Sequence, residues 1–330
     1  LSENRSWAEA GFVRAYDQFI LQRWDFKNLP SSKGPVLSLR KRRSMYQISN
    51  ALFSLGIDRN TGNIVEWTYA GQSILKKGPD FNIWRAPTDN DGVYVPGGAS
   101  NKMCKNWAGA GYDRMASDLK ALEVIEEEND IIQLRATYTH RSPGSSVGFR
   151  YKKTYTVHPS GSFELSTSVD TIGSGLPPLP RLGYILEFPG TFSQFTWYGR
   201  GPHGNYRDRN TSALLGKYAG SVEEQFTDYI VPQENGNKTD VRWAELSNDQ
   251  VAIWVGSNRP FETSVGYYSI PELTNAGHTY ELEKGNSVYW NIDFRQGGLG
   301  NQSCGPAPMD KYLLKPAERD FTFYFKPVKR

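Results

Sequence analysis

The sequence predicts an all-β protein in which two large antiparallel sheets pack face to face. Alternation of apolar and polar residues is common along the 330 residues, whereas helical periodicity is scarce. Glycine, proline and asparagine clusters separate the alternating segments, as turns between strands require. The chain is also rich in aromatic residues, with 9 Trp and 19 Tyr, and such residues favour strands. A large all-β domain can account for most of this length.

Two hairpins are the clearest elements. In residues 51–71, ALFSLGIDRNTGNIVEWTYAG, two strands flank a turn in which Asn60 and Gly62 can adopt positive φ. Residues 147–172 repeat the pattern, with Gly161 in the turn PSG. Further strands are predicted at 121–128, 131–140, 181–188, 240–246, 250–257, 261–268, 287–294 and 320–325.

The remaining segments complete the predicted organisation. Residues 101–120 and 271–276 are expected to be short helical insertions on the β framework. Residues 7–24 are predicted to be a strand, followed by a linker at 27–35, KNLPSSKGP. We therefore expect a boundary that separates residues 1–34 from a main domain at 35–330.

The charge balance, the lengths of the apolar runs and the cysteine count exclude several functional classes. Lysine and arginine number 38 against 35 acids, for a net charge of +3, which is too balanced for a nucleic-acid surface. No apolar run approaches the roughly 20 residues of a membrane helix. The two cysteines, Cys104 and Cys304, form neither a disulfide framework nor a metal-binding CxxC pair. We expect neither a nucleic-acid nor a membrane partner.

The stretch WYGRGPHGNYRDR, residues 197–209, predicts a loop held in a defined shape, because its glycines and proline interrupt regular structure. Its arginines and aromatic rings suit either the rim of a binding site or the bracing of a long loop. Bracing is favoured for Arg207 and Arg209, with Asp208 as the nearby partner.

Carboxylates offer several candidates for chemistry. A glycosidase needs two carboxylates about 5–5.5 Å apart for retention, or about 6.5–9.5 Å for inversion. The acids in suggestive positions are Asp89, Asp91, Asp208, Glu223, Glu224 and Glu234. The run DNDG lacks the fuller spacing of a calcium loop, so a hydrogen-bonded turn is favoured there.

Other catalytic patterns are weak. The glycine-rich run GGLGNQSCGP follows neither the GxGxxG nor the phosphate-loop pattern. Cys304 has no histidine near it in sequence, so a cysteine nucleophile is not favoured. The four histidines lack metal-ligand spacing. His203 or His278 with a carboxylate could move a proton at an anomeric carbon, as a sugar epimerase does.

Five stretches together resemble the C-terminal small-chain domain of family 2 β-galactosidases, and their order agrees across roughly residues 36–328. They are FNIWRAPTDNDG (81–92), NWAGAGYDRM (106–115), WYGRGPHGNYRDRNTSALLGKY (197–218), YIVPQENGNKTDVRW (229–243) and NIDFRQGGLGNQSCGP (291–306). The resemblance implies a very large two-sheet supersandwich similar to the galactose mutarotase fold. Residues 7–21 also resemble the last strand of the immunoglobulin-like domain that precedes it in those enzymes.

The resemblance also implies where catalysis occurs. In this family the acid/base glutamate, the nucleophile glutamate and a magnesium site lie on an upstream barrel domain. Such a barrel takes about 250 residues of alternating strands and helices, and this alternation is missing here. We therefore expect no catalytic residue, metal or cofactor in this chain, and magnesium in the absent barrel. The partners implied are the barrel domain of the same polypeptide and, through the parent enzyme, a β-galactoside.

One loop of the family's last domain reaches the aglycone side of the active site. The matching residues here are Gly298, Gly300, Asn301, Ser303, Cys304 and Pro306. Cys304 stands where well-known members carry a tryptophan. A thiol offers less stacking area than an indole, which predicts a wider leaving-group subsite. In the alternative interpretation Cys304 is a small filler that does not touch substrate.

Matched motifs also nominate positions near the barrel interface or a sugar rim: Trp84, Arg85, Trp197, Arg200, His203 and Asn235. The rival hypotheses are a stand-alone carbohydrate-binding module and a mutarotase-like epimerase. The resemblance implies a soluble parent enzyme in the cytoplasm or the periplasm and leaves a homo-oligomeric parent open.

Overall fold

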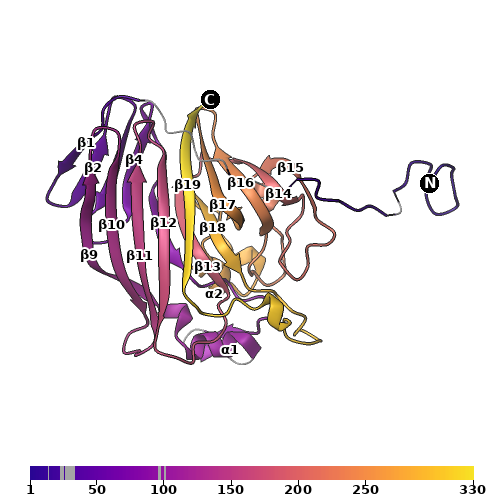
Figure 1. Cartoon of the computed structure of the whole chain (residues 1–330). Coiled ribbons are helices and arrows are strands. Elements are labelled where there is room, and N and C mark those ends of the chain that lie inside the picture. The colour runs from indigo at the N-terminus through magenta and orange to yellow at the C-terminus, as the bar shows by residue number, and fades with distance from the viewer. Residues whose placement is uncertain (14, 23–25, 27–33, 96–97, 100–101) are drawn as a thin grey trace.

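The computed structural model describes residues 1–13, 15–22, 26, 34–95, 98–99 and 102–330. Within that part of the chain, strands dominate and their pairings are antiparallel, which confirms the predicted fold class. Strand β17 (Val251–Gly266) belongs to both sheets: residues 251–257 pair with β19 (Arg319–Lys329), and residues 262–266 pair with β18 (Ser287–Gln296). Figure 1 shows the two layers.

The first sheet runs outward from β17 in two directions. On one side lie β19, β12 (Phe163–Ile172), β11 (Gly148–Val157), β10 (Ile132–Arg141) and β9 (Ala116–Glu127). On the other side lie β16 (Lys238–Ser247), β14 (Gln194–Gly201) and β15 (Leu214–Ser221).

The second sheet continues from β18. Its order is β13 (Arg181–Pro189), β6 (Lys77–Asn82), β4 (Ile64–Tyr69), β3 (Phe53–Asp58), β2 (Met45–Ser49) and β1 (Ser38–Lys41). Smaller elements are β5 (Gln72–Ser73), β7 (Tyr94–Val95), β8 (Gly98–Ala99), η1 (Tyr112–Arg114), η2 (Glu223–Gln225), η3 (Thr279–Glu281) and η4 (Asp310–Tyr312).

One hydrophobic core lies between the sheets. Along β10, buried residues alternate with half-buried ones, as a strand with one inward face requires. Across the sandwich, the rings of Trp67 on β4 and Phe163 on β12 lie 5.1 Å apart. The hydroxyls of Thr167 on β12 and Tyr184 on β13 are 2.7 Å apart. Contacts of this kind fix the two sheets against each other.

Both predicted hairpins are confirmed, with one correction. Gly62 and Gly161 have φ of 67° and 81°. A Cβ on Gly62 would lie 2.1 Å from the Tyr138 hydroxyl, so this turn requires glycine. Asn60 was expected to share the positive φ but does not. Its amide instead donates to Asp58 Oδ1 at 2.9 Å, which stabilises the turn without a left-handed residue.

The second helical insertion has its predicted length, whereas the first is shorter than predicted. Helix α2 (Ile270–Asn275) begins with a capping box in which Ser269 and Glu272 satisfy each other's backbone amides. Helix α1 (Lys102–Gly109) and η1 account for only part of 101–120, because residues from Ala116 onward extend β9 along β10. Tertiary pairing thus overrides the local helical pattern.

Two further strand assignments differ from the sequence-based expectation. Residues 197–201, predicted to be loop, form the end of β14, since their backbone pairs with β15. The segments predicted separately at 250–257 and 261–268 join into the bent strand β17.

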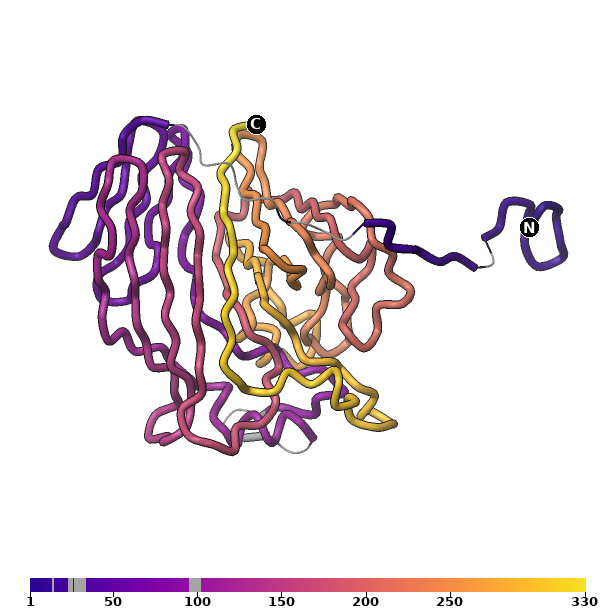
Figure 2. Tube along the Cα trace, in the orientation of Figure 1, coloured from indigo at the N-terminus to yellow at the C-terminus, as the bar shows by residue number. Residues whose placement is uncertain are grey.

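The N-terminal segment also differs from its prediction. Residues 7–13 and 15–22 form no strand, because nothing in the described chain pairs with them along their length; Figures 1 and 2 show this indigo segment extending away from the sandwich. The other residues of the predicted strand, and residues 27–33 of the predicted linker, lie outside the described residues. The division into 1–34 and 35–330 stays a prediction. Of the described helices, none combines the length and apolar character that crossing a membrane requires.

Lys153 on β11 gives the fold a testable pH dependence. It is fully buried, donates to Pro79 O at 3.1 Å and lies over the rings of Tyr138, Tyr155 and Tyr184 at 5.0–5.9 Å. Burial lowers its pKa to about 7 from 10.5, while Asp80 partly opposes the shift.

Between these pKa values the unfolded chain binds more protons than the folded chain, so the free energy of unfolding should rise with pH. We expect Lys153→Met to reduce that slope by about 1 kcal/mol per pH unit between roughly pH 7.5 and 9.5. Denaturant unfolding monitored by circular dichroism measures it. The matched control is exposed Lys152→Met; equal slopes for the two variants would contradict the assignment.

Candidate functional site

The candidate site is the loop at residues 297–306, which follows β18 and which we call the site loop. In Figures 1 and 2 it belongs to the gold segment that projects at the lower end of the molecule. Residues 297–300 are buried and residues 303–306 are exposed. The loop therefore has a fixed base and a presented tip.

Asp208 holds the base of the site loop. Its carboxylate accepts the amides of Leu299 at 3.1 Å and Gly300 at 2.7 Å. A Cβ on Gly298 would lie 2.9 Å from the Asp208 carboxyl carbon, and one on Gly300, whose φ is 64°, would lie 2.6 Å from Pro308 Cδ. These glycines permit a close backbone approach that no other residue allows.

Asn90 holds the tip from the other side. Its amide nitrogen donates to Gly300 O at 2.8 Å, and its oxygen accepts from the amide and hydroxyl of Ser303 at 3.0 and 2.6 Å. Arg209 adds hydrogen bonds to Gly300 O and to Asn301 Oδ1. Three sequence motifs therefore converge on the site loop.

A buried ion pair lies directly beneath it. Arg85 and Asp91, 1% and 2% exposed, form a two-point pair with distances of 3.0 and 2.7 Å. Arg85 also donates to Gly297 O at 2.8 Å and to Gly298 O at 3.3 Å. Burial disfavours the guanidinium charge, but Asp91 more than compensates, so the pKa of Arg85 is raised.

A second charged cluster lies next to it. Arg181 donates to Asp293 at 2.7 Å and to Glu234 at 3.1 Å, and all three are buried. Burial raises the pKa of Asp293 to about 6 against the opposing charge of Arg181. Burial likewise raises that of Glu262 to about 7. These carboxylates have hydrogen-bond partners inside the protein and are withdrawn from solvent.

Three other candidate acids are also engaged in local structure. Glu223 pairs with Lys284 at the surface, and Glu224 accepts the Ser221 amide at 2.7 Å. Asp91 accepts from the amide and hydroxyl of Thr88, at 2.9 and 3.0 Å, so DNDG forms the predicted hydrogen-bonded turn. Among the described residues, no three His, Cys, Asp or Glu side chains gather in a way that could ligate a metal ion.

The histidines of the epimerase hypothesis lie at the surface. His203 hydrogen-bonds Ser212 at 3.0 Å. His278 pairs with Glu281 at 3.0 Å, three residues away, and both side chains are about half exposed. The His278–Glu281 contact is thus local to one surface turn.

Two of the predicted rim positions, Trp197 and Arg85, lie in the interior. Trp197 is 2% exposed and donates to Arg200 O, so it lies in the core and offers no ring to a sugar. Arg85 is likewise interior. Arg200 pairs with Asp240 at 2.7 Å. Trp84 packs edge-on against Trp107 at 6.2 Å.

Asn235 and Arg209 also have defined roles. Asn235 accepts the Thr227 amide at 3.1 Å and closes a local turn. Arg209 does brace a loop, but it braces the site loop and not its neighbour Asp208, whose carboxylate faces the backbone of Leu299 and Gly300. Sequence proximity suggested the wrong partner, because long-range contacts decide it.

Sequence reasoning missed Asn90 and Gln233 as positioning residues. Gln233 accepts the Asp89 amide at 3.1 Å and so fixes the turn that carries Asn90. The available signal was the position of Asn90 between two acids in a hydrogen-bonded turn, where an amide can donate and accept at once.

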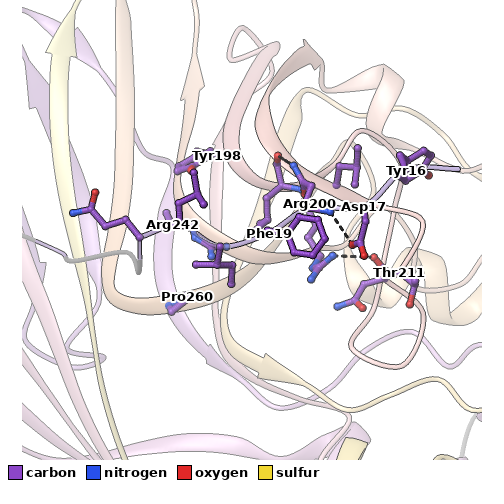
Figure 3. Close-up of a pocket in the computed structure, with 15 residues that line it drawn as sticks. Tyr16, Asp17, Phe19, Tyr198, Arg200, Thr211, Arg242 and Pro260 are labelled. Atoms are coloured by element: carbon purple, nitrogen blue, oxygen red, sulfur yellow. Dashed lines mark hydrogen bonds between the residues drawn. The ribbon is translucent and has the colours of Figure 1, made fainter. Parts of the chain in front are cut away.

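A separate cavity of about 1250 Å³ lies between the N-terminal segment and the first sheet. Figure 3 shows Tyr16, Asp17 and Phe19 of the segment and Tyr198 and Arg242 of the sheet around it. The Gln18 amide pairs with both backbone groups of Leu215, at 2.6 and 2.8 Å. The segment is thus attached to the free edge of β15 by side-chain hydrogen bonds.

The fold and the site define an antiparallel β-sandwich domain that presents one braced loop above buried ion pairs. The family described as "Beta galactosidase small chain" matches residues 49–326. The chain therefore belongs to the β-galactosidase small-chain family.

Relatives and solved structures can be compared over most of the chain. It is 31% identical to a β-galactosidase of Priestia megaterium over 99% of this chain, and 30% identical to one of Psychromonas ingrahamii over 95%. It spans only 31% and 30% of their lengths. A putative aldose 1-epimerase of Escherichia coli aligns with 87% of this chain and 99% of its own, at 14% identity and a TM-score of 0.46.

Removing the carboxylate that holds the site loop should loosen it. We expect Asp208→Ala to accelerate hydrogen exchange at the Leu299 and Gly300 amides by about 10-fold or more, since hydrogen bonds to charged groups contribute about 1.5–3 kcal/mol. Exchange followed by NMR or mass spectrometry measures this. Exposed Asp249→Ala is the control; unchanged exchange in Asp208→Ala would refute the bracing role.

Proposed function

We propose that this chain is the C-terminal, non-catalytic part of a retaining β-galactosidase. In this role it scaffolds an upstream barrel domain and contributes the site loop to the aglycone side of the active site. The observation that carries the proposal is the site loop itself, because Asp208, Asn90 and Arg209 hold its backbone while Ser303 and Cys304 remain exposed. A loop fixed in this way suits a surface that must meet another domain accurately.

The surroundings of the described carboxylates also support a non-catalytic role for this chain. The buried acids face arginines or amides, and the surface acids Glu223 and Glu224 have local partners. A retaining mechanism needs two accessible carboxylates about 5–5.5 Å apart. We therefore assign both catalytic glutamates and the magnesium site to the upstream barrel of the longer polypeptide.

Under this proposal the partners are the barrel domain and, through the assembled enzyme, a terminal β-galactoside. The relatives named β-galactosidase support that substrate class. The N-terminal segment fits the proposal as well: Phe19, Ile20 and Leu21 are at least 70% exposed, and we propose that an upstream immunoglobulin-like domain covers them as its neighbour.

The isolated chain should not hydrolyse a chromogenic β-galactoside above the buffer rate, whereas the full-length polypeptide should. Turnover by the isolated chain would overturn the placement of the catalytic pair. Two further measurements separate the alternatives. Acceleration of galactose anomer exchange in NMR would indicate an epimerase, and tight binding of galactose by the isolated chain would indicate a carbohydrate-binding module.

The tip of the site loop gives a specificity prediction. In the full-length enzyme, Cys304→Trp should raise kcat/KM for glucose-like leaving groups relative to small alcohols by about 3-fold or more, because an indole adds stacking area. Steady-state kinetics on paired substrates measures the ratio. Cys304→Ser is the matched control for loss of the thiol; an unchanged ratio in Cys304→Trp supports the filler interpretation.

A further inference from the structure

Four exposed apolar side chains gather beside the candidate site. Tyr229, Ile230 and Val231 are 45%, 83% and 46% exposed, and Tyr280 is 82% exposed. We call these four residues the apolar platform. Large apolar side chains clustered at a surface mark a contact site more often than isolated ones do.

The platform has a defined conformation. The Thr279 amide and hydroxyl donate to Ile230 O at 3.2 and 3.3 Å, which joins the two segments. The Tyr280 ring stacks on His278 at 5.0 Å with an interplanar angle of 13°. The exposure therefore comes from side chains on a backbone that hydrogen bonds hold together.

A short series of hydrogen bonds connects the platform to the site loop. Val231 O accepts from the Gln233 side chain at 3.0 Å, and Gln233 accepts the Asp89 amide at 3.1 Å. The next residue, Asn90, holds Gly300 and Ser303. The platform and the site loop therefore share one supporting turn.

We propose that the apolar platform is a contact surface for the upstream part of the same polypeptide, which seats the sandwich so that the site loop meets the barrel. This inference rests on the proposed function and names the surface through which it acts. The chain covers 31% of the length of the Priestia megaterium relative, so a partner of more than twice its size would be covalently attached.

The composition of the platform favours a protein over a sugar as its occupant. Sugar sites pair aromatic faces with convergent polar groups, whereas Ile230 and Val231 offer aliphatic surface without donors or acceptors. Aromatic and apolar residues are typical of the core of a protein interface, with charged groups at its rim. Exposed charged side chains, Asp228 and Glu281, flank the platform in sequence, as such a rim would.

Hydroxyl-radical footprinting of the full-length polypeptide and of residues 1–330 alone tests the proposal. We expect oxidation of Tyr280 and Ile230 to be at least 5-fold slower in the full-length protein, with equal rates at exposed Ile125 on β9 as the control. Equal rates at Tyr280 and Ile230 in an active full-length β-galactosidase would overturn this inference and leave the proposed function standing. Protection without galactosidase activity would overturn the proposed function instead.

Two other occupants give distinct results with the isolated chain. Protection that increases with the concentration of the isolated chain would show a second copy on the platform, and protection by added galactose would show a sugar; either result would overturn the proposal.

A variant of the full-length enzyme provides a second, independent test. Ile230→Lys in the full-length enzyme should shorten the half-life of thermal inactivation by about 10-fold relative to Ile125→Lys, while the isolated variant chains unfold at equal temperatures. Equal half-lives would contradict the proposal.

Discussion

The pairing of Arg85 with Asp91 is the interaction on which the rest of the site depends. The Arg85 guanidinium donates hydrogen bonds to both carboxylate oxygens of Asp91 and to the backbone oxygens of Gly297 and Gly298. One planar group thus ties the turn that carries Asn90 to the base of the site loop. Arginine suits this position because its donors are fixed in a fork, which lysine lacks. The loop conformation follows from that constraint and from Asp208 on the opposite side.

Burying charged side chains costs free energy, and each buried charge needs a partner to offset that cost. In this protein the partners form a network, in which Arg181 makes ion pairs with both Asp293 and Glu234. Removing one partner of a buried pair typically costs about 3–5 kcal/mol. A network of this kind adds little to the free energy of unfolding, but it fixes the positions of the groups that it joins. This fits a domain whose proposed role is to present a loop accurately to another domain.

The sequence predicted the site unevenly. The matched motifs identified the site loop and the run that contains Asn90, and local spacing identified the turn at Asp91. Trp197 and Arg85 were nominated for an interface or a sugar rim because they lie in matched motifs, yet both are interior. Burial of a side chain depends on which strands surround it, and β14 pairs with residues about 20 and 50 positions away in the sequence. Similarly, Asp208 was matched to adjacent arginines, because pairing across 91 residues with Leu299 leaves no local trace.

By itself, the sequence determined the all-β class, the two hairpins with Gly62 and Gly161, and the family, because alternation, turn residues and motifs are local properties of the chain. Only the tertiary structure decided that β17 bends to serve both sheets, that residues 7–13 and 15–22 form no strand with the described chain, and that Asn90, Asp208 and Arg209 meet on one loop. Each of these outcomes depends on contacts between residues far apart in sequence, and hydrogen-bond and packing geometry choose such partners only once the sheets are assembled.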